Sequence, residues 1–457
     1  MAKFIKYLSQ WNKSHLVISS MTVLFISAFT NLCHCQTVIN LESVFKNLES
    51  KNTEILQLRF QQAIAKQDIK EAKNLLLPRL SFEANHTSNL GFAFDQVAGQ
   101  LITGNKLTNY GNININAQTN IYKGLAIRNQ IKSAILELES TQLEEESLIK
   151  VLKLKLLQVY FTAIINKALY SSGLEQLKYS EKQLNSQYEQ LEAGTKTTID
   201  VSLAESQVET DKLNLLTNNN NYQNSILELK ELLNIPISES IILSEPDTTK
   251  FLEANGFQIT HNLHNFLQQN IFLKLSDMNI QKAEIAQKTA KNLRYPSISL
   301  SAAYATNYSS QRLDFLTNNY MSFWNQLNQN KALYIGASIS IPIFNNKIRS
   351  EIIKAKINLS IQESLKEKEK LSQEKIHTQA LQELLLSRKN YIVAEKKYKS
   401  LKNTLNAMNE RYNLGVASSI DFGKAILEHN QAQFDVITAH YNVIYNKMII
   451  EILFSII

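Results

Sequence analysis

The sequence predicts a mainly α-helical protein with a membrane-inserted β portion, built from two internal repeats. Three observations lead to this prediction: landmarks that recur at a constant spacing, four segments in which apolar and polar residues alternate, and two tracts with the periodicity of very long helices. The chain has 457 residues but contains only 11 glycines and 5 prolines. Few residues therefore interrupt regular structure, which favours long elements.

The two halves of the chain share three landmarks in the same order. Each landmark recurs 218 to 222 residues later, and a spacing this constant indicates an internal repeat. We therefore expect a first repeat over 36–255 and a second over 256–457, each with the order helix, strand, strand, long helix, tip and return helix. The matching landmarks are Ala72-Lys73-Asn74-Leu75 and Ala290-Lys291-Asn292-Leu293, Ile121-Tyr122 with Ile127-Arg128 and Ile343-Phe344 with Ile348-Arg349, and Gly194 with Asp200 and Gly415 with Asp421.

Four segments alternate between apolar and polar residues. In the third, Ile298, Leu300 and Ala302 share one face, and serines dominate the other. Such alternation is typical of a strand with one greasy and one wet face, and spans of ~10 residues match tilted transmembrane strands. The expected strands cover about 79–90, 111–121, 297–308 and 333–343.

A soluble, half-buried sheet would alternate in the same way. Two features favour the membrane: the polar faces consist mainly of uncharged amides and hydroxyls, and long links over 91–110 and 309–331 join the strands of each pair. Outer-membrane barrels have short periplasmic turns and longer outer loops. The second link carries the aromatic residues Tyr320, Phe323 and Trp324, which could be interfacial residues, a pore plug or ordinary loop packing.

Two long tracts follow the strand pairs. Residues 125–190 and 347–413 contain no proline, and the first begins with Ile127, Ile131 and Ile135 at helical spacing. Helices of this length reach about 100 Å at ~1.5 Å per residue. They need neighbours along their whole length, as in a coiled-coil tube or α-barrel. Each tract ends at a glycine-containing turn, so each forms an αα-hairpin with its return helix.

Four strands in one chain cannot close a barrel. Small barrels need ~8 strands, and an unpaired strand edge is not tolerated in hydrocarbon because its free N–H and C=O groups have no partner. If these strands span a membrane, two or more chains share one barrel. Barrel closure predicts a homo-oligomer but does not set the number of copies.

The N-terminus has the pattern of an export signal over 1–35. Lys3, Lys6 and Lys13 precede an apolar stretch, and cleavage before Gln36 is expected. Lipidation at Cys35 and a retained membrane anchor are the alternatives. Removing the three lysines lowers the formal net charge from +7 to +4, which is too mild to indicate nucleic-acid binding.

Several motifs resemble the TolC family of outer-membrane efflux and secretion channels. Residues 72–82 and 290–300 resemble the family's helix-to-strand entry, 339–346 its strand-to-helix exit, and 412–421 its hairpin tip. The resemblance implies a trimer in the cell outer membrane, with a shared twelve-stranded β-barrel and an α-barrel in the periplasm. It implies passive export for tripartite efflux or type I secretion, driven by an inner-membrane pump or ABC exporter through a periplasmic adaptor.

The tips of the two hairpins are the candidate functional site. Three copies would place Asp200 and Asp421 in rings at the tunnel's narrow end, and carboxylate rings can select cations. Both aspartates could also simply cap their helices. The resemblance implies a closing contact from an acidic residue of the first tip to an arginine and a tyrosine of the second. Asp200 and Tyr412 match, but the arginine position is Ala417 and a second acidic position is Lys424.

Lys196 or Lys424 could replace the missing arginine. Adaptor docking is expected at 193–198 and 414–419, which include four turn residues. These are Gly194, Thr195, Gly415 and Val416.

No catalytic residue, cofactor or metal site is expected. His261 and His264 are three residues apart, and we interpret them as surface residues because no carboxylate partner is evident. The alternative to a duct is an exported coiled-coil scaffold or surface-binding protein without a pore. The sequence does not name the cargo, and small molecules and polypeptides both fit the neutral polar face.

Overall fold

The computed structural model describes residues 37–245, 262–314 and 316–454. The expected signal peptide therefore lies outside the described residues. The chain divides into two compact units, and each draws on both halves of the sequence. The helical unit contains Leu148–Leu263 and Lys375–Ile457 together with the N-terminal residues up to Leu56; the sheet unit contains Gln57–Ser147 and His264–Glu374.

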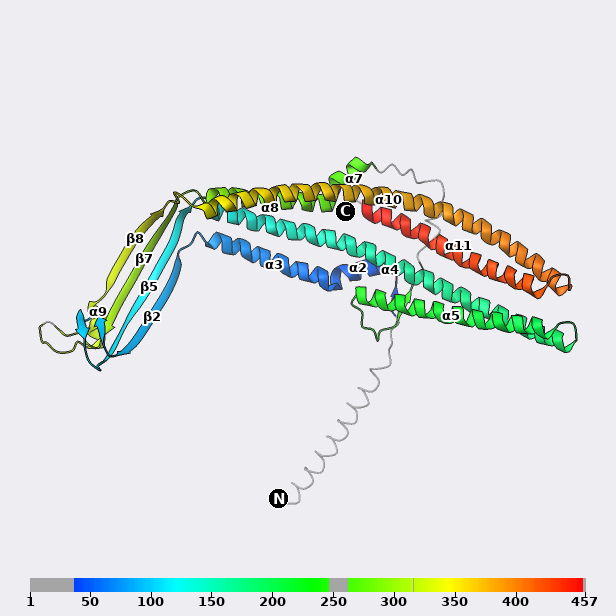
Figure 1. The fold of residues 1–457 in the computed structure, drawn as a ribbon, viewed down its shortest axis with the longest axis horizontal. Helices are drawn as coiled ribbons and strands as arrows, with labels where there is room; N and C mark the ends of the chain where they lie inside the picture. Colours follow the sequence, from blue (N-terminus) through cyan, green and yellow to red (C-terminus); the bar gives the residue numbers. More distant parts are fainter. Residues whose placement is uncertain (1–36, 246–261, 315, 455–457) are drawn as a thin grey trace, which may run out of the picture. The chain divides into compact units, whose positions relative to one another are not determined.

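The sheet unit is organised around one four-stranded antiparallel sheet (Figure 1). Its strands lie in the order β2, β5, β7, β8, so the two strands from each half of the sequence are neighbours in the sheet. Strand β8 ends earlier than the expected residue 343, because Pro342 has no N–H to contribute to a ladder. The bounds are β2 (Arg79–Leu90), β5 (Leu107–Lys123), β7 (Ser297–Ser309) and β8 (Ala332–Ser340).

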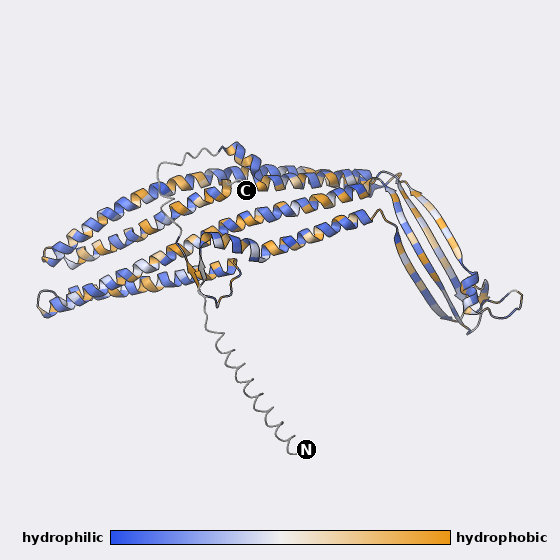
Figure 2. Ribbon diagram, turned by 180° about the vertical axis from the view of Figure 1, so that it is seen from behind, coloured by the Kyte–Doolittle hydropathy of each residue, from blue (hydrophilic) through white to orange (hydrophobic). Residues whose placement is uncertain are grey.

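The register of the sheet places the apolar residues of all four strands on one face. Figure 2 shows the resulting bands of opposite hydropathy along the strands. Many of these side chains are exposed in the single chain: Leu80 is 72% and Ile335 77% exposed. Two successive rows of this face are Leu80, Ala117, Ala302 and Ile335, followed by Phe82, Ile115, Tyr304 and Leu333.

Strand β5 departs from simple alternation near its end. A bulge lies between Asn120 and Tyr122, so Ile121 has no partner in β7. Alternation in the sequence places Ile121 on the aliphatic face of the strand. The extra residue in the bulge shifts every later side chain to the opposite face, so Tyr122 is the residue that pairs with Ile298.

Short elements occupy the two outer links. The first link forms a small hairpin of β3 (Ala93–Asp95) and β4 (Gln100–Ile102). The second contains α9 (Phe323–Gln329), which contacts β7. Buried polar side chains join these links to the end of β7: Gln326 Nε2 donates to the Ser309 carbonyl at 2.8 Å, and the Ser309 hydroxyl donates to Asp95.

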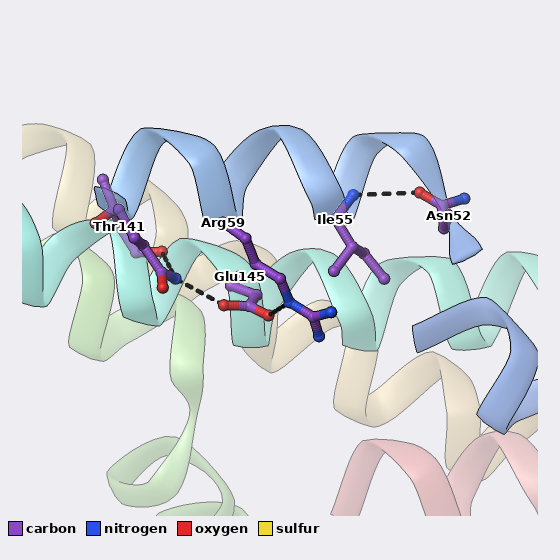
Figure 3. A network of polar contacts seen from close by, with 6 residues as sticks. Asn52, Ile55, Arg59, Thr141 and Glu145 are labelled. Carbon is purple, nitrogen blue, oxygen red and sulfur yellow. Dashed lines mark hydrogen bonds and ion pairs between the residues drawn. The ribbon is translucent and has the colours of Figure 1, made fainter. Parts of the chain in front are cut away.

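The long helices match the proline-free tracts. Helix α4 (Ala126–Glu192) has 67 residues and α10 (Asn346–Asn413) has 68. Within the sheet unit, α3 (Thr53–Asn74) contacts α4 through a polar network (Figure 3). Arg59 Nε lies 2.7 Å from one carboxylate oxygen of Glu145, and Gln62 donates to the other at 2.6 Å.

Two ion pairs also join helices of the sheet unit. Helix α7 (Leu263–Gln269) precedes α8 (Ile271–Asn292). Lys282 of α8 lies 3.1 Å from Glu137 of α4, and Lys366 of α10 lies 2.5 Å from Asp277 of α8. These pairs are partly exposed, so each contributes little to stability.

The apolar core lies in the helical unit. Helices α2 (Leu41–Lys51), α4, α5 (Thr198–Leu232) and α11 (Ser419–Phe454) share one hydrophobic cluster with β6 (Ile241–Leu243), which pairs in parallel with β1 (Thr37–Ile39). Tyr160 is fully buried, and its hydroxyl donates to the Ser244 carbonyl at 2.6 Å. Fully buried neighbours in this core include Leu48, Leu156, Leu229 and Ile444. Among the described residues, no helix is both long and apolar enough to cross a membrane.

Candidate functional site

The two hairpin tips have the same backbone geometry. Gly194 and Gly415 adopt left-handed conformations with φ of 71° and 74°, which glycine reaches without steric cost. In both tips the residue after the glycine donates to a carbonyl five residues earlier: Thr195 to Gln190 and Val416 to Arg411, each at 2.9 Å. This hydrogen bond ends each long helix in a Schellman turn.

Both tip aspartates cap a return helix. Asp200 accepts from the backbone N–H of Thr197 at 2.9 Å and completes a capping box at the start of α5. Asp421 accepts from the Ser418 hydroxyl at 2.7 Å, and that hydroxyl accepts from the Asp421 N–H at 3.1 Å. An acidic side chain in the first turn of a helix is also favoured by the helix dipole. The structure therefore supports the capping interpretation for both residues.

Tyr412 connects the second hairpin to the first. Its side chain is 3% exposed, and its hydroxyl donates to Gln187 Oε1 at 3.0 Å and lies 3.5 Å from Asp200 Oδ1. The ring stacks on Phe422 with 4.8 Å between centroids and an angle of 10°. Tyr412 is thus held by hydrogen bonds on one hairpin and by aromatic packing on its own.

Lys196 supplies a positive charge at the same place. Its ammonium lies 3.4 Å from the centroid of the Tyr412 ring and donates to the Tyr412 carbonyl at 3.4 Å. An ammonium over an aromatic face is attracted by the ring quadrupole. We call the set of Gln187, Lys196, Asp200, Tyr412 and Phe422 the tip lock.

The remaining candidates lie outside the tip lock. Lys424 is exposed and 4.0 Å from Glu428 on its own helix. Asp421 contacts Ser418 of its own turn, and Ala417 packs against the Tyr412 cluster. Of the expected gate residues, the structure therefore brings together Lys196, Asp200 and Tyr412.

Sequence reasoning missed two members of the tip lock. Gln187 is 2% exposed, yet glutamine in a long polar helix gives no signal of burial. Phe422 follows the capping Asp421, and Tyr412 precedes Gly415 by three residues. The sequence signal for the stacking of Tyr412 on Phe422 was that these two aromatic residues flank the tip glycine.

The environment of Tyr412 keeps its phenol neutral. Burial, together with the charge of Asp200 and the hydrogen bond to it, raises the pKa of Tyr412 to about 12. For Asp200, burial acts to raise the pKa. The hydrogen bonds that Asp200 accepts from the Thr197 backbone and from the Ser419 and Thr197 hydroxyls act in the opposite direction, as does the charge of Lys196. Together these effects outweigh burial, so the pKa of Asp200 is below its ordinary value. The phenol donor and the carboxylate acceptor therefore coexist at neutral pH.

The outer aromatic residues form two separate contacts. The Phe323 ring meets Tyr308 edge-on at 4.7 Å and Trp324 at 5.2 Å, and Trp324 remains 75% exposed. Tyr320 contacts Lys106, whose ammonium lies 3.4 Å from its hydroxyl. Phe323 and Trp324 are therefore in contact, whereas the Tyr320 hydroxyl contacts Lys106 of the first link.

Metal-binding geometry is absent from the part of the chain that the structure describes, where no three His, Cys, Asp or Glu side chains gather. His261 lies outside the described residues. The His264 ring is 2.9 Å from the Gln268 amide.

An amphipathic antiparallel sheet joined to helical hairpins of this length defines a class of protein, the outer-membrane channels. The chain belongs to the outer membrane efflux protein family, whose model matches residues 44–234 and 262–447. It is accordingly an outer-membrane protein, and the relatives it resembles are channels rather than enzymes.

Individual relatives agree with this family assignment. The outer membrane protein TolC of Escherichia coli strain K12 is 23% identical over 447 residues, covering 94% of this chain and 84% of TolC. The open-state MtrE outer membrane channel of Neisseria gonorrhoeae is 17% identical with a TM-score of 0.74, covering 90% of this chain and 88% of MtrE. The CmeC outer membrane channel of Campylobacter jejuni is 16% identical with a TM-score of 0.74, covering 91% of this chain and 85% of CmeC.

The pKa directions predict that the tip lock is insensitive to pH near neutrality. The pKa of Asp200 is lowered from 3.8, so its contribution is complete above that value and is lost as pH falls through the folded pKa. The pKa of Tyr412 is raised from 10.0, so the stability that its neutral phenol contributes is complete below pH 10.0 and is lost as pH rises through about 12. If the tip lock holds a channel entrance closed, single-channel conductance should be constant from about pH 5 to 9 and rise in stronger acid. A conductance step between about pH 5 and 7 would contradict this assignment.

Proposed function

We propose that three copies of this chain form the exit duct of a tripartite efflux or type I secretion system. Each copy contributes four strands to one twelve-stranded barrel in the outer membrane, and the helical hairpins of the two repeats form an α-barrel in the periplasm. The duct is a passive conduit for small molecules or polypeptides. An inner-membrane pump or ABC exporter supplies the energy through a periplasmic adaptor.

The four-stranded sheet is the observation that carries this proposal. Strands β2 and β8 lie at its two edges, and no further strand pairs with them among the residues that the structure describes. Its apolar face is exposed, as at Leu80 and Ile335. A lipid-facing wall with open edges is stable only when further chains close the barrel. Twelve strands leave a passage, whereas eight would be filled by side chains.

The tip lock is proposed to hold the periplasmic entrance closed. It ties the second hairpin to the first within one chain, through Tyr412 and Lys196. Separating the hairpins would break the cation–π contact and both phenol contacts together. Asp200 and Asp421 of three copies would line the same entrance with carboxylates, which attract cations.

The exposed turns of the tips are the proposed docking points for the adaptor. Leu414 is 78% and Val416 67% exposed, although both are apolar. Exposed apolar side chains at a helical turn suit a protein partner better than water. Residues 193–198 and 414–419 form these two turns, with Gly194, Thr195 and Gly415 among them.

Detergent extraction and planar bilayers test the proposal. The protein, purified in mild detergent, should run as an SDS-resistant oligomer three times the mass of the heated chain, and it should conduct ions. A two- or four-fold mass would correct the stoichiometry. A soluble monomer without conductance would favour the coiled-coil scaffold instead.

A further inference from the structure

The polar face of the β2-β5-β7-β8 sheet is almost free of charge. Its rows consist mainly of serine, threonine, asparagine, glutamine and small residues, together with Tyr110 and Tyr334, and basic side chains lie where strands meet helices, at Arg79 and Lys123. Within these four strands, every residue of which the structure describes, Glu83 is the only carboxylate. It lies on the polar face, because its neighbours Phe82 and Ala84 occupy the apolar one.

The surroundings of Glu83 leave its carboxylate open to the polar side. It pairs with Asn114, whose amide donates to Glu83 Oε2 at 3.3 Å. The same row continues through Ala305 and Ala332, which are too short to cover it. Glu83 helps to line a hollow of 520 Å³, together with Ser81, Asn116, Ser301 and Tyr334.

We propose that Glu83 makes the barrel lumen itself cation-selective, as a charged ring separate from the tips. This rests on the proposed barrel, in which three copies would place three carboxylates at one height. Arg79 is four residues earlier on the same strand, about 13 Å away at ~3.3 Å per residue. That separation exceeds the Debye length of ~10 Å at 0.1 M salt, so the basic end does not cancel the field of Glu83.

Reversal potentials in planar bilayers under a KCl gradient test the proposal. Glu83→Gln should lower the K⁺ to Cl⁻ permeability ratio roughly twofold at 0.1 M salt, and less at 1 M. Glu83→Lys should shift it further toward Cl⁻, and Arg79→Gln should raise it. Glu83→Asp keeps the charge and should leave the ratio close to that of the unmodified protein.

The same variants are measured in a Tyr412→Ala background, so that a closed entrance does not mask the barrel. An unchanged ratio for Glu83→Gln and Glu83→Lys in both backgrounds, with SDS-resistant oligomers formed, would overturn the role of Glu83. Absence of conductance in the unmodified protein would instead overturn the proposed duct.

Discussion

Replacing Tyr412 with alanine is expected to raise single-channel conductance severalfold. Tyr412 is 3% exposed, stacks on Phe422 and reaches the first hairpin through its hydroxyl. Truncating a buried aromatic side chain costs about 3–5 kcal/mol of packing and hydrogen bonding. In the closed state this loss falls on the contact between the two hairpins, so the equilibrium shifts toward the open entrance. Conductance histograms from planar bilayers measure the shift.

Two lysine variants separate the tip lock from general charge effects. Lys196→Met keeps the length of the side chain but removes a cation–π contact that is worth about 0.5–2 kcal/mol, so it should raise conductance less than Tyr412→Ala. Lys424→Met removes an equal charge from an exposed residue that pairs with Glu428 of its own helix. It should leave conductance unchanged. A larger effect from Lys424 than from Lys196 would show that the charge of the lock was assigned to the wrong lysine.

Replacing Gly111 with alanine is expected to abolish the SDS-resistant oligomer. A Cβ at Gly111 would lie 2.2 Å from the Asn85 carbonyl oxygen and 2.8 Å from the Tyr308 ring. The carbonyl belongs to the backbone of β2, so it cannot move without breaking the ladder between β2 and β5. Because β2 is an edge strand of the sheet, its displacement also removes the edge that the next chain would pair with.

Gly336 provides the matched control, because it is also a glycine within a strand. A Cβ there would lie 3.3 Å from the Ser301 hydroxyl oxygen, and a hydroxyl can rotate away. Gly336→Ala should therefore form the oligomer in normal yield. Band intensity on unheated SDS gels, with circular dichroism of the same samples, measures both variants. Equal yields of the two variants would show that the clash at Gly111 is relieved by local movement.

Local periodicity in the sequence was sufficient to predict the four strands of the large sheet and the two long helices. Alternation placed β2 and β7 close to their observed bounds, and the absence of proline marked α4 and α10. These patterns arise because burial on one face repeats every 2 residues in a strand and every 3.6 in a helix. The bulge at Ile121 was not predictable in the same way, since it depends on how β5 pairs with β7.

The candidate site was only partly predictable. Asp200, Tyr412 and Lys196 were identified from the tip motifs, but sequence could not choose between Lys196 and Lys424. The structure brings Lys196 over the Tyr412 ring and leaves Lys424 beside Glu428. Gln187 was missed because its burial depends on Tyr412, which is 225 residues away in the chain.

The sequence by itself determined the strands, the long helices, the tip turns and the helix caps. Each of these depends on residues within a few positions of one another, such as Thr197 with Asp200 and Ser418 with Asp421. Tertiary structure alone decided the sheet order, the shared apolar face and the members of the tip lock. These depend on residues that lie far apart in the chain, and periodicity carries no information about which distant side chains meet.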